Sequence, residues 1–262
     1  MAEVLAPDGT RLHVEVDGSG DPVTVFAHGL TNSCMELSAF TPLAPGTKVR
    51  FCFRGHGHSG TPDPGHYRFD DFAGDVDAVA TAHGATRAVG TSLGQGAITR
   101  LLASTPDRFE RLVFILPAAL DVPLAGTELE GFDRTATLLE TLPADEAIEK
   151  ILGDSGRAVE YAEQPWLRDV DMLLWQDLQP VGVARALREV TRDVAIQDRE
   201  LLRRVDTPSI VIAREGDPIH PADLARVLVD LLPNAELIML GSEAELYASI
   251  PMLVQRVADF LA

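Results

Sequence analysis

The 262-residue sequence predicts an α/β protein with a mostly parallel central sheet, helices on both faces and an inserted helical cap. Three observations predict this fold. Short apolar runs typical of buried strands alternate with segments of helical periodicity in both terminal parts of the chain. One serine, in the glycine-rich stretch 90–96, stands between such a strand and such a helix. From residue 121 to about 204 only helical periodicities recur, so we predict a core of residues 1–120 and 205–262 and a cap of residues 121–204.

The predicted strands begin with an antiparallel pair. Asp8-Gly9 is a strong hairpin signal, and residues 10–17 after it alternate between apolar and polar side chains. The other strands are short apolar runs, expected at residues 22–27, 48–53, 86–89, 111–116, 209–213 and 236–240. Helices are expected up to residue 40, over 70–83, from the glycine-rich stretch to Pro106, near 221–232 and from about 252 to 262. Strands that alternate with helices in this way pair mostly in parallel.

The composition is that of an ordinary globular protein, and the charge disfavours some partners. Hydrophobic residues make up 46% of the chain and charged residues 24%, and no apolar run approaches the roughly 18 residues that span a membrane. The formal charge of −18 disfavours nucleic acid and anionic membrane surfaces, whose phosphates would be repelled. We therefore expect a small-molecule substrate and no nucleic-acid or membrane partner. The sequence leaves the oligomeric state open.

The start of the chain and its cysteines both favour the cytoplasm. Residues 1–7 lack the basic start and apolar core of a secretory signal. The two cysteines, Cys34 and Cys52, have no metal-ligand spacing and fit a reducing compartment. We expect both to be buried small apolar residues, the protein to be cytoplasmic, and no residue to hold a metal.

The stretch Gly90-Thr91-Ser92-Leu93-Gly94 has the pattern of a nucleophile elbow, a tight turn between a strand and a helix. Such a turn forces the serine into strained backbone angles, so that its hydroxyl stands clear of the sheet edge. Glycine is required at positions 90 and 94 because a Cβ there would crowd the turn. The amide of Leu93, at the helix N-terminus, then points toward whatever is bonded to Ser92 Oγ. Taken alone, the same pattern also fits a glycine-rich loop without a catalytic role.

Four landmarks, in order along the chain, resemble those of the α/β-hydrolase superfamily, specifically its cofactor-free members with a helical cap after the sixth strand. They are the oxyanion motif His28-Gly29-Leu30, the turn Arg54-Gly55-His56-Gly57-His58-Ser59, the elbow Gly90–Gly94 and the acid loop around Gly216-Asp217. The aspartate that usually stands two residues before the arginine is Cys52 here. The resemblance covers nearly the whole chain.

The resemblance implies a serine hydrolase that needs no cofactor. Ser92 would be its nucleophile and Asp217 its triad acid. The amides of Leu30 and Leu93 would form the oxyanion hole, and the motif glycines would be Gly29, Gly90 and Gly94.

A fifth landmark of this family, the general base, is missing from its usual place. The family carries a histidine in the loop after the eighth strand, shortly before the proline that opens the last helix, whereas this chain has no histidine after His220. Counting back from Pro251 puts the vacant position at Ala244. A serine hydroxyl needs such a base to become a nucleophile, so we predict that Ala244→His creates or restores acyl transfer by Ser92.

Other residues could substitute as the base, and each has a simpler interpretation. His220 lies three residues beyond Asp217, where we expect it to face the cap or the solvent. Glu243 and Glu245 could act as weak carboxylate bases, but on so acidic a protein we expect them to be solvated charges. Without a histidine after the eighth strand, Asp217 is expected to lack a partner.

The cavity above the nucleophile is expected to be largely apolar. Its candidate wall residues are His28, His220, Trp166 and Trp175, although tryptophans at helical spacing usually pack a core. One hypothesis is a hydrolase of an ester, lactone or carbon–carbon bond whose histidine has been replaced by alanine. The second is a natural family member that catalyses an elimination, cyclisation or rearrangement in small-molecule biosynthesis, and the third is a ligand-binding protein. The first is favoured because the nucleophile, the acid and both oxyanion positions are intact.

Overall fold

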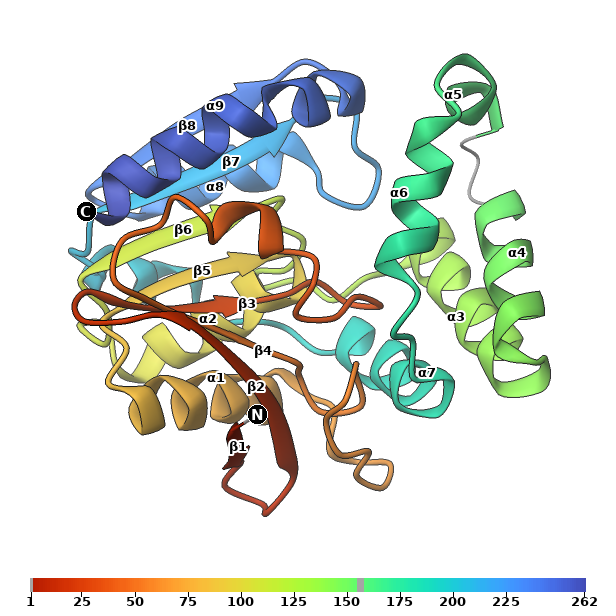
Figure 1. Cartoon of the computed structure of the whole chain (residues 1–262), viewed down its shortest axis with the longest axis horizontal. Helices are drawn as coiled ribbons and strands as arrows, with labels where there is room; N and C mark the ends of the chain where they lie inside the picture. Colours follow the sequence, from red (N-terminus) through yellow and green to blue (C-terminus); the bar gives the residue numbers. More distant parts are fainter. Residues whose placement is uncertain (1, 155–157) are drawn as a thin grey trace.

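The computed structural model describes residues 2–154 and 158–262, and over these the chain forms one eight-stranded sheet between two layers of helices (Figure 1). The strands follow the spatial order β1-β2-β4-β3-β5-β6-β7-β8. Their bounds are β1 Ala2–Leu5, β2 Arg11–Gly18, β3 Val23–Ala27, β4 Thr47–Phe51, β5 Arg87–Thr91, β6 Arg111–Ile115, β7 Ser209–Arg214 and β8 Ala235–Leu240. All six strands from β3 to β8 run in parallel, while β2 pairs antiparallel with both β1 and β4. The predicted fold class, with its antiparallel start, is therefore confirmed.

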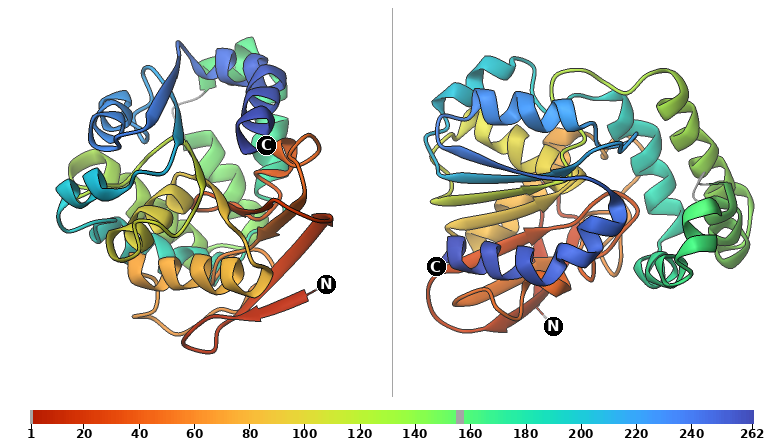
Figure 2. Two further views of the ribbon diagram at one scale, coloured as in Figure 1. Left: turned by 90° about the vertical axis from the view of Figure 1, so that its left-hand side faces the viewer. Right: turned by 90° about the horizontal axis from the view of Figure 1, so that it is seen from above.

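The helices are α1 Phe69–His83, α2 Leu93–Ser104, α3 Gly126–Thr141, α4 Ala144–Asp154, α5 Ala158–Glu163, α6 Trp166–Leu174, α7 Pro180–Glu189, α8 Ala222–Leu231 and α9 Glu243–Leu261, with short 3-10 helices η1 Ser38–Phe40, η2 Val190–Arg192 and η3 Arg199–Arg204. Apolar faces of α1, α2 and α8 pack on one side of the sheet. On the other side α9 and the segment around η1 pack against the same strands, as the turned views in Figure 2 show. Because both faces are covered, the parallel strands are apolar on both sides.

The segment between β6 and β7 is helical, and it contains no strand among its described residues. Helices α3 to α7 lie beyond the carboxyl ends of the parallel strands, on the right in Figure 1. Buried side chains of α3, α4 and α7 form a small core of their own, separate from the two core clusters on the sheet. The division into a core of residues 1–120 and 205–262 and a cap of residues 121–204 stays a prediction.

Two predicted helices differ in extent from the observed ones. The helix expected up to residue 40 is mostly turns, with only η1 as a regular element. The last helix is expected from about residue 252, after Pro251, but α9 begins at Glu243 and contains that proline. Its start is fixed by Ser242, whose hydroxyl accepts a hydrogen bond from the amide of Glu245. An N-cap of this kind satisfies backbone donors that a loop would leave open, which is why the helix starts directly after β8.

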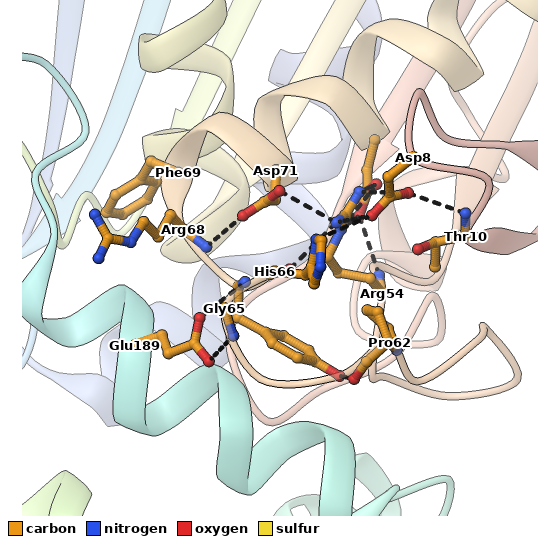
Figure 3. Close-up of polar contacts among 12 residues, drawn as sticks. Asp8, Thr10, Arg54, Pro62, Gly65, His66, Arg68, Phe69, Asp71 and Glu189 are labelled. Atoms are coloured by element: carbon orange, nitrogen blue, oxygen red, sulfur yellow. Dashed lines mark hydrogen bonds and ion pairs between the residues drawn. The ribbon is translucent and has the colours of Figure 1, made fainter.

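The arginine of the glycine-rich turn after β4 is buried in a network of carboxylates (Figure 3). Arg54 is 1% exposed, and its guanidinium lies 2.7 Å from Asp75, 2.8 Å from Asp8 and 3.4 Å from Asp71. Asp8 comes from the β1–β2 hairpin and the other two carboxylates from α1, so Arg54 joins three segments. A buried arginine needs such partners, and Asp75 is the most buried of the three. The usual aspartate of the family is absent, because Cys52 stands at its position.

The same close-up shows how the helical segment is tied to the core. Glu189, at the end of α7, accepts hydrogen bonds from the backbone amides of Gly65 and Tyr67.

The cysteines are both free and buried, as expected, and the amide of Cys34 lies 3.5 Å from Cys52 Sγ.

Candidate active site

Ser92 stands on a sharp turn between β5 and α2, at the carboxyl edge of the sheet. Its backbone angles are φ 49° and ψ −105°, so the strain expected at the elbow is present. A Cβ on Gly94 would lie 2.1 Å from the carbonyl oxygen of Ala27 in β3, and one on Gly90 would lie 2.7 Å from a backbone carbon of Gly94. Both glycines are therefore required by the close approach of the turn to itself and to β3, as the sequence predicted.

His220 and Asp217 complete a chain of hydrogen-bond contacts that starts at Ser92. His220 Nε2 lies 3.1 Å from Ser92 Oγ, and His220 Nδ1 lies 3.0 Å from Asp217 Oδ2. Because a carboxylate only accepts, Nδ1 carries the proton toward Asp217 and Nε2 presents its lone pair to the serine hydroxyl. This order of nucleophile, imidazole and carboxylate is the geometry that acyl transfer by a serine needs.

The loop after β7 places acid and base together through its own turn. Asp217 Oδ1 accepts hydrogen bonds from the amides of Ile219, at 2.9 Å, and His220, at 3.0 Å, which is the pattern of an Asx turn. The turn folds the chain back on itself, so the side chain three residues on returns to the second carboxylate oxygen. Arg214, at the end of β7, adds an ion pair of 2.9 Å to that oxygen.

The electrostatics of this loop keep Asp217 ionised. Burial alone would raise the pKa of the carboxyl, but the hydrogen bond and charge of His220, followed by the charge of Arg214, outweigh it and lower the pKa to about 2. Asp217 is only 8% exposed, so water screens these contacts weakly. An ionised Asp217 holds the imidazole in one tautomer and stabilises the imidazolium that forms when it accepts a proton.

These contacts correct three expectations about the base. His220 does not face the cap or solvent but contacts Ser92, and its side chain is 17% exposed. Asp217 does not lack a partner. Ala244 lies in the first turn of α9 and is not among the residues that line the cavity at Ser92. The spacing that pointed to Ala244 assumes that Pro251 opens the last helix, whereas Pro251 lies inside α9.

Glu245 has a structural role in place of the weak-base role considered above. Its carboxylate accepts a hydrogen bond of 2.6 Å from the amide of Gly241, and its own amide donates to Ser242 Oγ. The pair is a variant of the capping box, in which serine and glutamate three residues apart satisfy backbone donors at a helix start. The side chain of Glu243, the other carboxylate considered, lies outside the described part of the structure.

A cavity of about 250 Å³ opens at Ser92 and His220. Its lining is mostly apolar, as expected. Helical-segment residues on this lining include Val122, Leu124, Phe132 and Val190, and core residues include Phe69 and Leu116. The cavity thus lies between the sheet edge and the helices that cover it, the usual place for a ligand site in this type of sheet.

Three of the residues predicted to line this cavity do not line it. Trp166, on α6, is 41% exposed and makes an edge-to-face contact with Tyr247 of α9, with ring centroids 5.3 Å apart. Trp175 packs against the core of the helical segment. His28, directly after β3, is buried and is not on the lining of the cavity. The tryptophans follow the simpler interpretation, in which aromatic residues at helical spacing pack against neighbouring helices.

His28 is held neutral by burial, and both of its ring nitrogens contact the backbone. Its Nδ1 lies 2.7 Å from the carbonyl oxygen of Gly29, and its Nε2 accepts a hydrogen bond of 3.0 Å from the amide of Phe53. One nitrogen donates and the other accepts, which is the pattern of a neutral imidazole. Burial, reinforced by the nearby charge of His56, lowers its pKa to about 3. His28 therefore links the loop after β3 to Phe53, which follows β4.

The two residues expected to form the oxyanion hole both line the cavity. Leu30 follows β3 and Leu93 opens α2, and both share the cavity lining with Ser92 and His220. The elbow and the loop after β3 are joined by a hydrogen bond from the amide of Gly94 to the carbonyl of His28, at 3.1 Å.

Two clusters of metal-ligating side chains occur among the described residues, and neither lies on the lining of the cavity. One comprises His13, Glu15 and Cys34, and the other Asp8, His66 and Asp71. In the first, Glu15 is paired with the guanidinium of Arg50 at 2.8 Å, and in the second Arg54 pairs with both aspartates. A cation already balances the carboxylates in each cluster, so neither is an attractive metal site.

Solved structures of known proteins resemble the whole chain. A hydrolase from Pseudomonas aeruginosa is 24% identical, with a TM-score of 0.79, and the match covers 100% of this chain and 98% of the other. The enol-lactonase from Burkholderia xenovorans is 21% identical, with a TM-score of 0.81 and 99% of both chains covered. The bottromycin epimerase, solved with bottromycin A2, is 20% identical, with a TM-score of 0.76 and coverage of 100% and 99%. At these identities the likeness shows the fold.

None of the helices over the described residues is both long and apolar enough to cross a membrane.

The sequence itself matches a family profile. The profile described as alpha/beta hydrolase fold matches residues 25–247, which include the elbow, the loop with Asp217 and His220, and the helical segment. By sequence as well as by topology, the chain belongs to the alpha/beta hydrolase family.

Proposed function

We propose that this protein is a serine hydrolase of small, largely apolar carboxylic esters or lactones, with Ser92 as nucleophile, His220 as general base and Asp217 as the acid that orients it. The observation that carries the proposal is the position of His220, whose two ring nitrogens contact Ser92 Oγ and Asp217 Oδ2. This contact supports His220 as the base, so the proposal does not need the inactivating replacement considered at Ala244.

The chemistry follows from the direction of these hydrogen bonds. His220 Nε2 takes the proton of Ser92 as Oγ attacks the carbonyl carbon, and the electron pair of the C=O bond moves to oxygen. The amides of Leu30 and Leu93 are proposed to stabilise that oxyanion. The imidazolium then gives its proton to the departing alkoxide, which leaves an acyl group on Ser92. Water, deprotonated by the same imidazole, releases the acid and restores the hydroxyl.

The substrate class is proposed from the cavity. Its apolar side chains favour apolar acyl or alcohol groups, and a cavity of about 250 Å³ suits a small molecule better than a polymer. Similar structures include a thermophilic esterase from Thermogutta terrifontis and the enol-lactonase, which agree with ester and lactone substrates. Cleavage of a carbon–carbon bond needs the same triad and is a second bond type to assay.

Covalent labelling tests the proposal. A fluorophosphonate probe should react quickly with the protein at neutral pH, and short-chain para-nitrophenyl esters should be hydrolysed at rates that saturate with substrate. Ser92→Ala should abolish both, while its far-ultraviolet circular dichroism matches the wild type. Labelling that survives in Ser92→Ala, or an unlabelled and inactive wild type that is fully folded, would refute the proposal. In the second case a non-hydrolytic role in the same cavity becomes the leading alternative.

A further inference from the structure

One charged side chain on the wall of the mostly apolar cavity has no role in the proposed triad. Glu36, between β3 and η1, lines the cavity together with Ser92 and His220. Its Oε2 accepts a hydrogen bond of 2.6 Å from the amide of Gly29, and its Oε1 accepts one of 2.6 Å from the side chain of Asn32. Both oxygens thus accept from N–H donors of the loop that is proposed to hold the oxyanion, which is the pattern of an ionised carboxylate.

Glu36 lies very close to the nucleophile. A Cβ placed on Gly29 would lie 3.1 Å from Glu36 Oε1 and 3.5 Å from Ser92 Cβ. The carboxylate and the serine therefore both lie next to Gly29. Because Glu36 and Ser92 line the same cavity, an acyl group bonded to Ser92 occupies the space that this carboxylate borders.

The charge of Glu36 is not balanced by a lysine or an arginine on the described lining of the cavity. The described lining contains no lysine or arginine, and its second carboxylate, Asp193, accepts hydrogen bonds from the amides of Phe69 and Val194. The pKa of Glu36 is raised, because the effect of burial outweighs the hydrogen bonds of Gly29 and Asn32 and the charge of His220, which lower it. A negative group on the substrate would meet these carboxylates in a poorly hydrated space, where like charges repel strongly.

We propose that Glu36 sets the charge preference of the enzyme: the acyl groups that it accepts are neutral or cationic, and those that carry a carboxylate are rejected. This inference rests on the proposed hydrolase function and narrows its substrate class. Glu36 is a specificity residue in this proposal, since the proton transfers belong to Ser92 and His220.

Esters matched in shape and different in charge test the inference. The para-nitrophenyl esters of hydrogen adipate and methyl adipate compare an anion with a neutral group, and those of gamma-(trimethylammonio)butyrate and 5,5-dimethylhexanoate compare a cation with its neutral isostere. We expect the wild type to hydrolyse the neutral adipate ester with a kcat/KM at least about tenfold above that of the anionic one. The cationic ester should be hydrolysed at least as well as its isostere.

Glu36→Gln should lower the neutral-to-anionic ratio of kcat/KM by about tenfold and reduce its dependence on ionic strength. The variant fits the site, because Asn32 Oδ1 has no hydrogen-bond partner among the described residues and, after rotation of its amide, can accept from the introduced glutamine side chain. Asp107→Asn, an exposed carboxylate outside the cavity, is the control of equal net charge and should leave the ratio unchanged.

The outcomes separate this inference from the function on which it rests. Absence of Ser92-dependent turnover for every ester would refute the hydrolase function. Hydrolysis of the anionic and neutral esters at equal kcat/KM by the wild type would overturn only the role of Glu36, and this comparison decides even if Glu36→Gln fails to fold. An unchanged ratio in a folded Glu36→Gln variant would overturn it as well.

Discussion

The loops that follow β7 and β8 are neighbours at the carboxyl edge of the sheet, but among the described side chains only the first loop contacts Ser92. The loop after β7 bends through the Asx turn of Asp217 and brings His220 to the nucleophile. The chain after β8 enters α9 almost at once, because Ser242 and Glu245 cap the helix. Hydrogen bonds among a few neighbouring residues therefore determine which loop reaches the nucleophile. The position of the loop in the order of strands matters less.

The largest effect is expected from removing the imidazole after β7. His220→Ala should lower kcat for the best ester on the order of a millionfold, because Ser92 then has no group to accept its proton. Stopped-flow or long-time assays of ester hydrolysis measure the loss, with fluorophosphonate labelling as a second readout. A folded His220→Ala variant with near wild-type turnover would show that another residue is the base. The loop after β7 would then not carry it.

A smaller loss is expected when the acid is made neutral without a change of shape. Asp217→Asn keeps an oxygen that can accept from the amides of Ile219 and His220, so the turn should persist while the charge that orients the imidazole is lost. We expect kcat to fall by about ten-thousandfold, with a small change in KM. If activity is retained while the melting temperature falls, Asp217 serves only the fold of the loop.

A change after β8 should affect stability and leave catalysis intact. Ser242→Ala removes the oxygen that accepts from the amide of Glu245 and should lower the free energy of unfolding by about 1 kcal/mol. Urea denaturation measures this loss, and ester hydrolysis at a temperature well below unfolding should match the wild type. A loss of kcat without a loss of stability would show that this loop takes part in catalysis.

The smallest effect is expected at the position that family spacing favoured for the base. Ala244 lies in the first turn of α9, and Ala244→His should leave kcat within about twofold of the wild type. The same substitution in the His220→Ala background should not rescue turnover. A large gain in either background would restore Ala244 as the site of the base and make the contact of His220 with Ser92 incidental.

Residue order predicted the parts of this protein that depend on local pattern. The elbow follows from glycines that have no room for a Cβ, and the parallel sheet follows from the alternation of apolar runs and helical periodicities. His220 was misjudged because its position depends on a turn between residues three apart and on a contact with Ser92 that is 128 positions away. A signal was present, since an aspartate that caps its own turn brings the side chain three residues later back toward it.

Glu36 was missed for a different reason. Its carboxylate lies within a segment expected to be helical, where an isolated glutamate indicates an exposed face, yet the chain forms turns there. The walls of the cavity were also misassigned, because Trp166 and Trp175 find partners in α9 and in the helical segment. Contacts between segments far apart in the chain have no counterpart in periodicity, so pattern cannot supply them.

The short distance in sequence between Asp217 and His220 changes what the fold must align. When acid and base come from different loops, three independent segments have to meet with errors below about 1 Å, and movement of any one misaligns the imidazole. Here the proposed acid and base lie on one turn, so only the position of that turn against the elbow remains to be set. No described residue of β8 or α9 lines the cavity, so the contacts between Ser92, His220 and Asp217 place no direct demand on the sequence of that edge.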